Sequence, residues 1–185
     1  MASERDSAAT RTQDIMETPA TRSPDDDVRT LGELIAGIRI AMLASTAPDG
    51  SLVSRPLATL EVDFDGDLWF FTSATSGKVD DIARQPRVNV AYADPDDGLY
   101  VSVVGTAQVL HDKAKIEALW HPQATIFFPG GKDDPDLRLL RIRVDSAEYW
   151  RQNSGLVSQA LALMSAVTGA GPQDLGENRE LHIRR

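Results

Sequence analysis

Closely spaced turn motifs constrain this chain more than any other feature of its sequence. Pro48-Asp49-Gly50, Asp65-Gly66 and Asp94-Pro95-Asp96-Asp97-Gly98 each stand between two segments of β-forming residues. Asp-Gly pairs favour tight turns because glycine adopts the positive φ that such turns require. The segments between the turns are too short to hold the crossover helix that parallel strands need. The sequence therefore predicts consecutive strands that pair in antiparallel fashion.

Six segments have the alternation and the β-branched or aromatic content of strands. They are Arg39–Thr46, Leu52–Val62, Leu68–Phe71, Val88–Tyr92, Tyr100–Leu110 and Leu137–Val144. Gly105, inside one of them, predicts a β-bulge or a close approach of two backbones. We expect a mainly β fold with short α-helices, arranged as a small antiparallel barrel of six strands.

Short helices are predicted between these strands by apolar residues at helical spacing. The predicted helices are Val28–Gly37, a segment around Val79–Ala83 that stops before Pro86, and a segment capped by Asp112 that stops before Pro122. The acids at Asp25–Asp27 suit the N-terminus of the first helix, whose dipole end is positive.

The chain divides into three parts by composition. Residues 1–27 have no periodic apolar pattern and are expected to form a disordered N-terminal tail. Residues 28–152 hold all the predicted strands and form the expected domain. Residues 153–185 are expected to be a C-terminal helix or tail, in which Leu156–Val167 could be a helix and Gly169–Arg185 a tail.

Charge and cysteine content exclude several classes of function. The 185 residues include 28 acidic and 19 basic side chains, a net charge of -9, and no cysteine. Disulfides, thiolate nucleophiles and Cys-ligated metals are therefore excluded, and the three histidines are too far apart for a metal site. An acidic chain does not favour nucleic acid or anionic lipid as partner. With no secretory signal or membrane span, we expect a cytoplasmic protein.

One segment combines hydroxyl groups, a glycine and a cation at a strand end and the following helix start. Thr72 and Ser73 end a predicted strand, and Ser76-Gly77-Lys78 opens the next helix. Free backbone N–H groups, hydroxyl donors and one ammonium together favour an anion such as a phosphate monoester. The alternative is a helix cap with a solvated Lys78. The spacing does not match a P-loop.

A second cation, Arg55, lies within a predicted strand and is followed by Pro56. Proline confines a strand to a sheet edge or a bulge, which leaves backbone groups near Ser54 and Leu57 able to meet a ligand. Arg55 and Lys78 together could neutralise one phosphate dianion. The alternative is an Arg55 side chain that points outward from an exposed strand.

Three further arginines, Arg138, Arg141 and Arg143, lie near or in the last predicted strand. Arg141 and Arg143 stand at strand spacing among apolar residues. We interpret the set as a solvated strand face or as ion pairs at an interface, in preference to a surface for nucleic acid.

Short motifs in a fixed order identify a family. They are Ser54-Arg55-Pro56, Leu68-Trp69-Phe70-Phe71-Thr72-Ser73 with Ser76-Gly77-Lys78, Pro86-Arg87-Val88, Val103-Val104-Gly105-Thr106-Ala107, Leu119-Trp120, Phe128-Pro129-Gly130-Gly131 with Asp134-Pro135, and Ala147-Glu148-Tyr149-Trp150. Over roughly Val28–Trp150 this order and spacing resemble the general stress protein family of pyridoxamine 5'-phosphate oxidase-like FMN-binding split barrels.

The resemblance implies a split β-barrel that binds FMN, or else FAD, and pairs as a homodimer with flavin at the subunit interface. By residue, it implies that Arg55, Thr72, Ser73, Ser76 and Lys78 hold the phosphate and ribityl chain. It also implies that backbone near Pro56, Leu57 and Phe71 meets the isoalloxazine, and that Trp120 and Trp150 lie near the ring or the partner subunit. The alternative for both tryptophans is a core or interface position.

The same resemblance implies a flavin-dependent oxidoreductase whose redox chemistry is carried by FMN. The physiological electron donor is not indicated, and no catalytic side chain emerges. One alternative is a stress protein that stores or senses FMN or FAD without turnover, and another is a dimeric scaffold without cofactor. Vitamin B6 oxidation is not expected, because Gly77-Lys78 stands where the true oxidases have Arg-Lys and their C-terminal substrate motif is absent.

Overall fold

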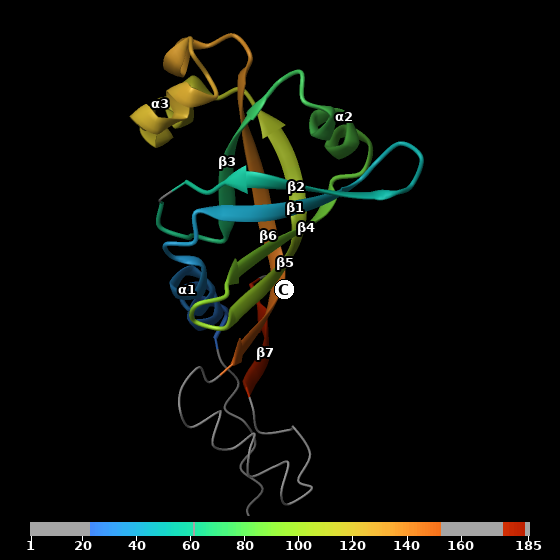
Figure 1. Cartoon of the computed structure of the whole chain (residues 1–185), viewed down its shortest axis with the longest axis vertical. Coiled ribbons are helices and arrows are strands. Elements are labelled where there is room, and N and C mark those ends of the chain that lie inside the picture. Colours follow the sequence, from blue (N-terminus) through green and yellow to red (C-terminus); the bar gives the residue numbers. More distant parts are fainter. Residues whose placement is uncertain (1–22, 61, 153–175, 184–185) are drawn as a thin grey trace, which may run out of the picture.

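Every strand that the structure describes belongs to one antiparallel sheet (Figure 1). The computed structural model describes residues 23–60, 62–152 and 176–183. The strands are β1 (Ile40–Thr46), β2 (Leu52–Ala58), β3 (Asp67–Ser73), β4 (Arg87–Asp94), β5 (Leu99–Leu110), β6 (Leu137–Gln152) and β7 (Gly176–His182). The helices are α1 (Pro24–Ile35), α2 (Gly77–Arg84), α3 (Lys113–Leu119) and the 3₁₀ turns η1 (Pro122–Ile126) and η2 (Gly131–Asp133). The mainly β, antiparallel fold predicted from the sequence is confirmed.

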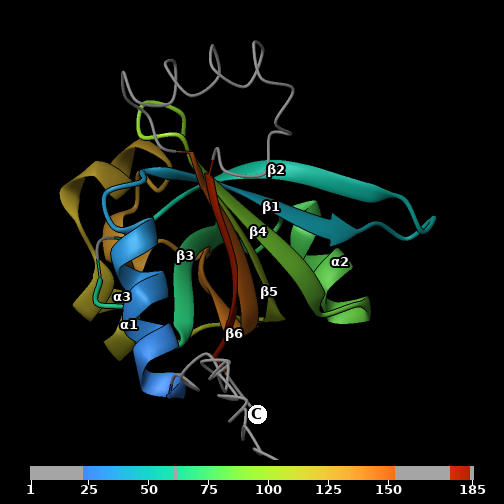
Figure 2. The same cartoon turned by 90° about the horizontal axis from the view of Figure 1, so that it is seen from below.

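The strand order is β2-β1-β4-β5-β6-β3, with β7 added on β6. The sheet curls so far that its two ends, β2 and β3, contact each other, although the described residues of these strands form no ladder. Figure 2 shows the strands grouped around a common centre. Pro56 therefore lies on an edge strand, as predicted, because β2 pairs only with β1 in this order.

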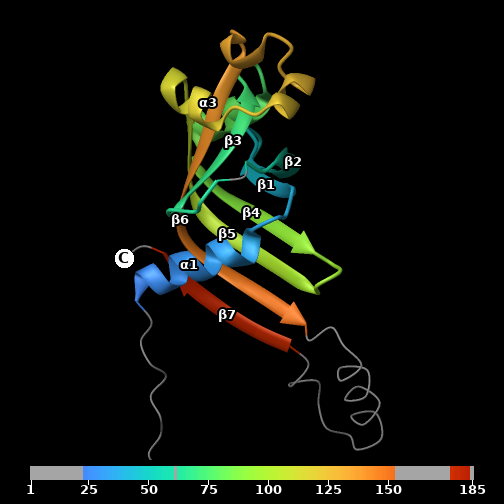
Figure 3. The same cartoon turned by 90° about the vertical axis from the view of Figure 1, so that its left-hand side faces the viewer.

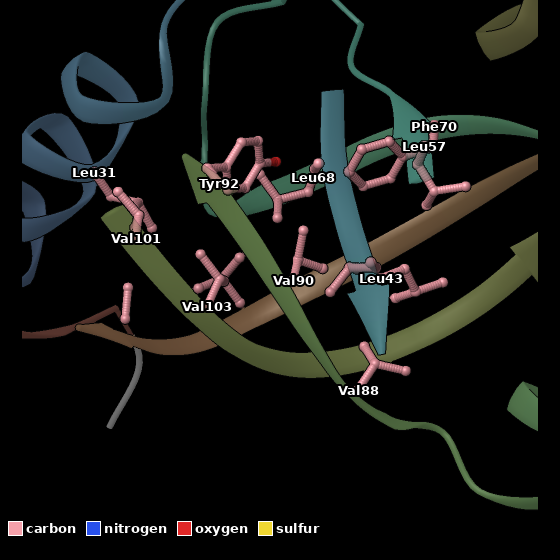
Figure 4. Close-up of a cluster of buried hydrophobic side chains, with 14 of the residues drawn as sticks. Leu31, Leu43, Leu57, Leu68, Phe70, Val88, Val90, Tyr92, Val101 and Val103 are labelled. Atoms are coloured by element: carbon pink, nitrogen blue, oxygen red, sulfur yellow. The ribbon is translucent and has the colours of Figure 1, made fainter. Parts of the chain in front are cut away.

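The core is divided by the alternation of side chains along β3 and β6. Leu68 and Phe70 face the main core inside the curled sheet, which Figure 4 shows together with Leu43, Val90 and Tyr92. The intervening residues, Trp69 and Phe71, face the opposite way and pack on a smaller cluster beneath α3. That cluster is built on four buried side chains, Ile116, Phe128, Leu137 and Leu139. Each strand thus presents one row of side chains to each apolar cluster.

A bulge between Val104 and Gly105 breaks the register of β5 and β6. Asp145 is the extra residue, because Val104 pairs with Ser146 and Gly105 with Val144. The bulge shifts the alternation of β6, so that Leu140, Ile142 and Val144 before it and Ala147 and Tyr149 after it are all buried. The bulge predicted from Gly105 is confirmed.

The C-terminal end corrects one sequence expectation. Within the segment predicted as a tail, residues 176–182 form β7, which pairs with the last part of β6. Leu181 is fully buried and Ile183 nearly so, while the residues between Glu177 and Glu180 are exposed. The strand was missed because it is rich in charged residues and its pairing partner is distant in sequence. The predicted helix Leu156–Val167 lies outside the described residues.

Helix α1 begins at Pro24, inside the segment predicted as an N-terminal tail. Ser23 caps it by accepting a hydrogen bond from the Asp26 backbone N–H at 3.2 Å, and Pro24 suits the first turn because its missing donor is not needed there. The buried Asp27 carboxylate accepts the backbone N–H of His182 at 3.0 Å. Figure 3 shows α1 lying beside β7. The N-terminal helix thus stabilises the C-terminal strand.

Helices α2 and α3 both lie toward one end of the long axis, on opposite sides of the strands, and β7 lies toward the other end (Figure 1). Asp112 caps α3 by accepting the Lys115 backbone N–H at 3.0 Å, as predicted. Helix α2 begins at Gly77 with Ser76 as its N-cap, which agrees with the predicted helix start at Ser76-Gly77-Lys78. None of the helices in the described ranges has the length and hydropathy needed to cross a membrane.

Gly105→Ala tests the close approach at the bulge. A Cβ at this position would lie 2.5 Å from the Arg143 carbonyl oxygen and 2.9 Å from the Ile142 Cγ2 atom. Because the nearest atom is backbone, the substitution should lower the free energy of unfolding by about 2–3 kcal/mol, measured by urea denaturation. Gly77→Ala is the matched control, since a Cβ there would meet no atom within 4 Å, and it should change stability by less than about 0.5 kcal/mol. Equal stability of the two variants would contradict the packing argument.

Candidate functional site

Arg55 points toward the inside of the curled sheet. It pairs in register with the buried Leu43, so the two side chains share a face. Its Nη2 atom lies 3.0 Å from the Oδ2 atom of Asp81 on α2, and the side chain is 22% exposed. The same Asp81 oxygen accepts a hydrogen bond from the Ser45 hydroxyl at 3.0 Å. Arg55 is therefore held in place beneath α2, and the alternative of an outward, solvated side chain does not apply.

Lys78 lies in the first turn of α2 and reaches back to the end of β3. Its Nζ atom donates hydrogen bonds to Thr72 Oγ1 at 3.0 Å and to Ser76 Oγ at 2.8 Å. Thr72 is buried, whereas Lys78 is half-buried. Ser76 precedes α2 as its N-cap, but its hydroxyl does not accept a backbone N–H and instead accepts from Lys78. We call Arg55, Thr72, Ser76 and Lys78 the anion cluster.

The two cations of the anion cluster act on each other electrostatically. Burial and the neighbouring Arg55 guanidinium hold the pKa of the Lys78 ammonium below its ordinary value of 10.5. Two like charges at one partly buried place disfavour each other, and a bound anion would remove that repulsion. The two hydroxyls that accept from Lys78 keep their own hydrogens, which can be donated to an anion. This donor set has the chemistry of a phosphate site.

Ser73 lies next to Thr72 but on the other side of β3. Its hydroxyl donates to the Asp136 carboxylate, which also accepts the Thr75 backbone N–H at 3.2 Å. The Ser73 hydroxyl and, to a lesser degree, the Thr75 and Ala74 backbone N–H groups hold the pKa of the Asp136 carboxyl below its ordinary value of 3.8. The Ser73 side chain thus stabilises the turn between β3 and α2, and the structure does not bring it into the anion cluster.

Three other predicted residues lie along β2, on both of its faces. Ser54 and Pro56 are exposed on the outer face of the sheet. Leu57 is buried in the main core, opposite Ala41. Their side chains therefore do not join the anion cluster, and the expected flavin contacts at this strand involve its backbone.

Phe71 and Trp120 lie together in the smaller apolar cluster. Their ring centroids are 5.7 Å apart, and the ring of Phe71 also lies 6.4 Å from that of Phe128. Trp120 is half-buried and follows the last residue of α3. The structure thus places both rings on the face of β3 that is opposite to Thr72.

Trp150 lies far from the anion cluster along β6. It pairs with Tyr100 on β5 and Asn178 on β7, and it is 38% exposed. The anion cluster lies near the start of β6, where Leu137 pairs with Ser73 of β3. The length of strand from Leu137 to Trp150 is about 40 Å at ~3.3 Å per residue. The structure therefore does not bring Trp150 to the anion cluster.

Asp81 is a site residue that sequence reasoning missed. Its side chain is 8% exposed, and it joins α2 to β1 through Ser45 and to β2 through Arg55. A buried carboxylate within an amphipathic helix indicates a fixed cationic partner, because an unpaired buried charge is costly. The neighbouring Ile82, a buried core residue, was the available signal that Asp81 lies near the inner face of α2.

Comparison with known proteins gives one family and several related folds. A family model described as pyridoxamine 5'-phosphate oxidase like matches residues 26–173. The protein bli-3 of Neurospora crassa is 24% identical over 167 residues, which cover 85% of this chain and 80% of that protein.

Solved structures of general stress proteins share the fold. One from Jannaschia sp. CCS1, described as general stress protein 26, has a TM-score of 0.65 and 24% identity, and the match covers 86% of this chain and 99% of that one. A general stress FMN/FAD binding protein from Xanthomonas citri has a TM-score of 0.62 and 30% identity, over 71% of this chain and 93% of that one. These structures confirm the split-barrel fold.

The pKa of Lys78 can be measured directly. We expect NMR titration of the lysine side chains to place it below 10.5, and Arg55→Ala to raise it, because the neighbouring positive charge is removed. Lys132 is the internal control, since the Glu117 carboxylate holds its pKa above 10.5 and it should titrate alike in both proteins. A Lys78 pKa at or above 10.5 in the wild type would show that the two cations do not interact.

Proposed function

Because the chain belongs to the pyridoxamine 5'-phosphate oxidase-like family, we propose that it binds FMN through the anion cluster. The observation that carries the proposal is the Lys78 ammonium, held between the hydroxyls of Thr72 and Ser76 beside the Arg55 guanidinium. The FMN/FAD-binding relative from Xanthomonas citri, at 30% identity, supports the same cofactor.

The residues present fit a phosphate monoester. A monoester carries close to two negative charges at neutral pH and accepts several hydrogen bonds. Lys78 and Arg55 supply positive charge, and the Thr72 and Ser76 hydroxyls supply uncharged hydrogen-bond donors. Asp81 orients the Arg55 guanidinium from α2 and leaves most of its five donors available. The chain's own contribution is therefore to bind and orient the cofactor at one end of the barrel.

We propose further that the protein is a flavin-dependent oxidoreductase. FMN, when bound, supplies the hydride or electron transfer, and the protein supplies binding, orientation and electrostatics. No side chain is assigned a catalytic role. Turnover of NAD(P)H, quinone or oxygen by the loaded protein would support this proposal, and tight flavin binding with no turnover of any donor would contradict it.

A flavin-binding stress protein without turnover is the second candidate. It is favoured by the solved relatives, which are described as general stress proteins. The two candidates share the same site and differ only in whether the bound flavin is turned over. Vitamin B6 oxidation is not proposed. A cytoplasmic location stays a prediction.

The outer face of β1 and β2 supports assembly as a homodimer. The outward positions of these strands carry no charged side chain, although 25% of the whole chain is charged. Three of them are large and apolar, with exposures of 53% for Ile40, 40% for Met42 and 79% for Leu52. Two small outward residues of β4, Ala91 and Ala93, continue this face. An apolar surface of this kind is typical of an interface.

We propose that this face pairs with a second copy of the chain, and that flavin binds at the subunit interface. Tyr100 and Trp150 lie on the outer face of the same sheet and are exposed. Within one subunit Trp150 is too far along β6 to meet a ligand at the anion cluster. A flavin contact by Trp150 would therefore come from the partner.

Replacing either cation of the anion cluster tests whether FMN binds at this site. Lys78→Ala and Arg55→Ala should each weaken FMN binding by about 1–3 kcal/mol, because each removes a charge-assisted phosphate contact. Binding is followed by flavin fluorescence or by the visible spectrum of the protein after FMN is added. Lys132→Ala, which removes an exposed lysine paired with Glu117, is the control and should bind FMN as the wild type does. Unchanged affinity in both cluster variants would reject the site.

A charge on the outer face of β1 tests the dimer. Met42→Asp should convert a dimer into monomers, since a buried unpaired carboxylate at an interface is costly. Light scattering coupled to gel filtration measures the mass of each species. Ile126→Asp is the matched control, because Ile126 is 78% exposed but lies on η1, away from this face. A wild-type protein that is monomeric at all concentrations would refute the assembly.

A further inference from the structure

Arg138 lies beside the anion cluster, at the second residue of β6. It pairs in register with Thr72, the buried hydroxyl that accepts from Lys78. Side chains paired across two antiparallel strands point to the same face, with Cβ atoms about 5 Å apart. The next pair on that face is Phe70 and Leu140, both in the main core. Arg138 is thus on the inner face, at the barrel end where Lys78 lies.

The other two arginines of this strand lie on the opposite face. Arg141 pairs with Trp69, and its guanidinium bonds to Asp67 at 2.7 Å. Arg143 pairs with Asp67 and is exposed. Arg138 and Arg141 are three residues apart. Because successive side chains of a strand point to opposite faces, an odd separation places these two on different faces. The three arginines that the sequence suggested as one set are therefore two separate groups.

The guanidinium of Arg138 is anchored on one side only. Its Nη1 atom donates to the carbonyl oxygens of Pro135 at 2.9 Å and Leu137 at 2.8 Å, which uses both hydrogens of that nitrogen. The Nη2 and Nε donors have no acceptor among the residues that the structure describes. A planar group fixed by two backbone bonds keeps its free edge in a set orientation, so it loses little entropy when a ligand binds.

The charge balance of the anion cluster calls for a further cation. Asp81 is paired with Arg55, so the two together are close to neutral and Lys78 supplies one unmatched charge. A phosphate monoester carries close to two. After the Ser73 hydroxyl and the Thr75 and Ala74 N–H groups, the charge of Arg138 also lowers the pKa of Asp136. Arg138 therefore lies close enough to act on Asp136, whose carboxylate accepts the Ser73 hydroxyl and the Thr75 N–H in the turn between β3 and α2.

We propose that Arg138 is a third cation of the phosphate site, with its Nη2 and Nε edge directed at the phosphate oxygens. This inference rests on the proposed binding of FMN. It assigns to the start of β6 a role in selecting the phosphorylated flavin over riboflavin, which has the same ring and ribityl chain without the charge.

The test compares FMN with riboflavin, because the two ligands differ only in the phosphate. Dissociation constants are measured by flavin fluorescence for the full-length wild type and for Arg138→Ala. We expect Arg138→Ala to weaken FMN about tenfold or more and to leave riboflavin binding within about twofold. Arg138→Lys keeps the charge but not the fork and should recover part of the loss. Arg143→Ala, on the same strand but the opposite face, should behave as the wild type.

The outcomes separate this inference from the proposal on which it rests. If Arg55→Ala and Lys78→Ala lose FMN but Arg138→Ala does not, the role of Arg138 is refuted and FMN binding stands. Equal losses for FMN and riboflavin in Arg138→Ala would refute it too, since they would show that Arg138 only holds the Pro135 turn. Should Arg138→Ala fail to fold, Arg138→Gln retains the donors toward the two carbonyls without the charge, and the same comparison decides. A wild type that binds neither flavin would overturn both.

Discussion

The long strand β6 determines how the rest of this fold is arranged. It pairs with β5 along most of its length, with β3 at its start and with β7 at its end. A regular strand of this length could not bury one row of side chains throughout, because the sheet twists and curls. The extra residue Asp145 changes which side chains face inward, and Gly105 lets the Arg143 carbonyl approach closely. The two halves of β6 can thus serve one core.

The anion cluster follows from the same arrangement, since its parts come from separate elements. Thr72 lies near the end of β3, Arg55 lies on β2, Ser76 is the N-cap of α2, and Lys78 lies in its first turn. The Asp81 carboxylate joins α2 to β1 and β2, so the helix that carries Lys78 has a fixed position. Positioned charges of this kind bind an anion without a large rearrangement, which is the basis of preorganised recognition.

Local sequence signals predicted the parts of the fold that depend on neighbouring residues. Gly105 indicated the bulge, Pro56 indicated an edge strand, and Asp112 indicated a helix cap, and the structure confirms all three. Strand β7 could not be predicted in this way, because only Leu181 and Ile183 are buried and its partner strand is remote in sequence. The same limit applies to the site. The proximity of Lys78 to Thr72 was predictable because the two are close in sequence. The Arg55–Asp81 pair and the position of Arg138 opposite Thr72 were not, because they depend on tertiary contacts.

The lowered pKa of Lys78 has a consequence for the amount of folded protein. Burying the Lys78 ammonium near the Arg55 guanidinium costs free energy, so the ligand-free fold is less stable than its packing alone would allow. An anion that binds only the folded state raises the free energy of unfolding in proportion to the logarithm of its concentration. If FMN binds there as proposed, its phosphate would relieve this repulsion, and the stability of the folded chain would depend on the concentration of FMN.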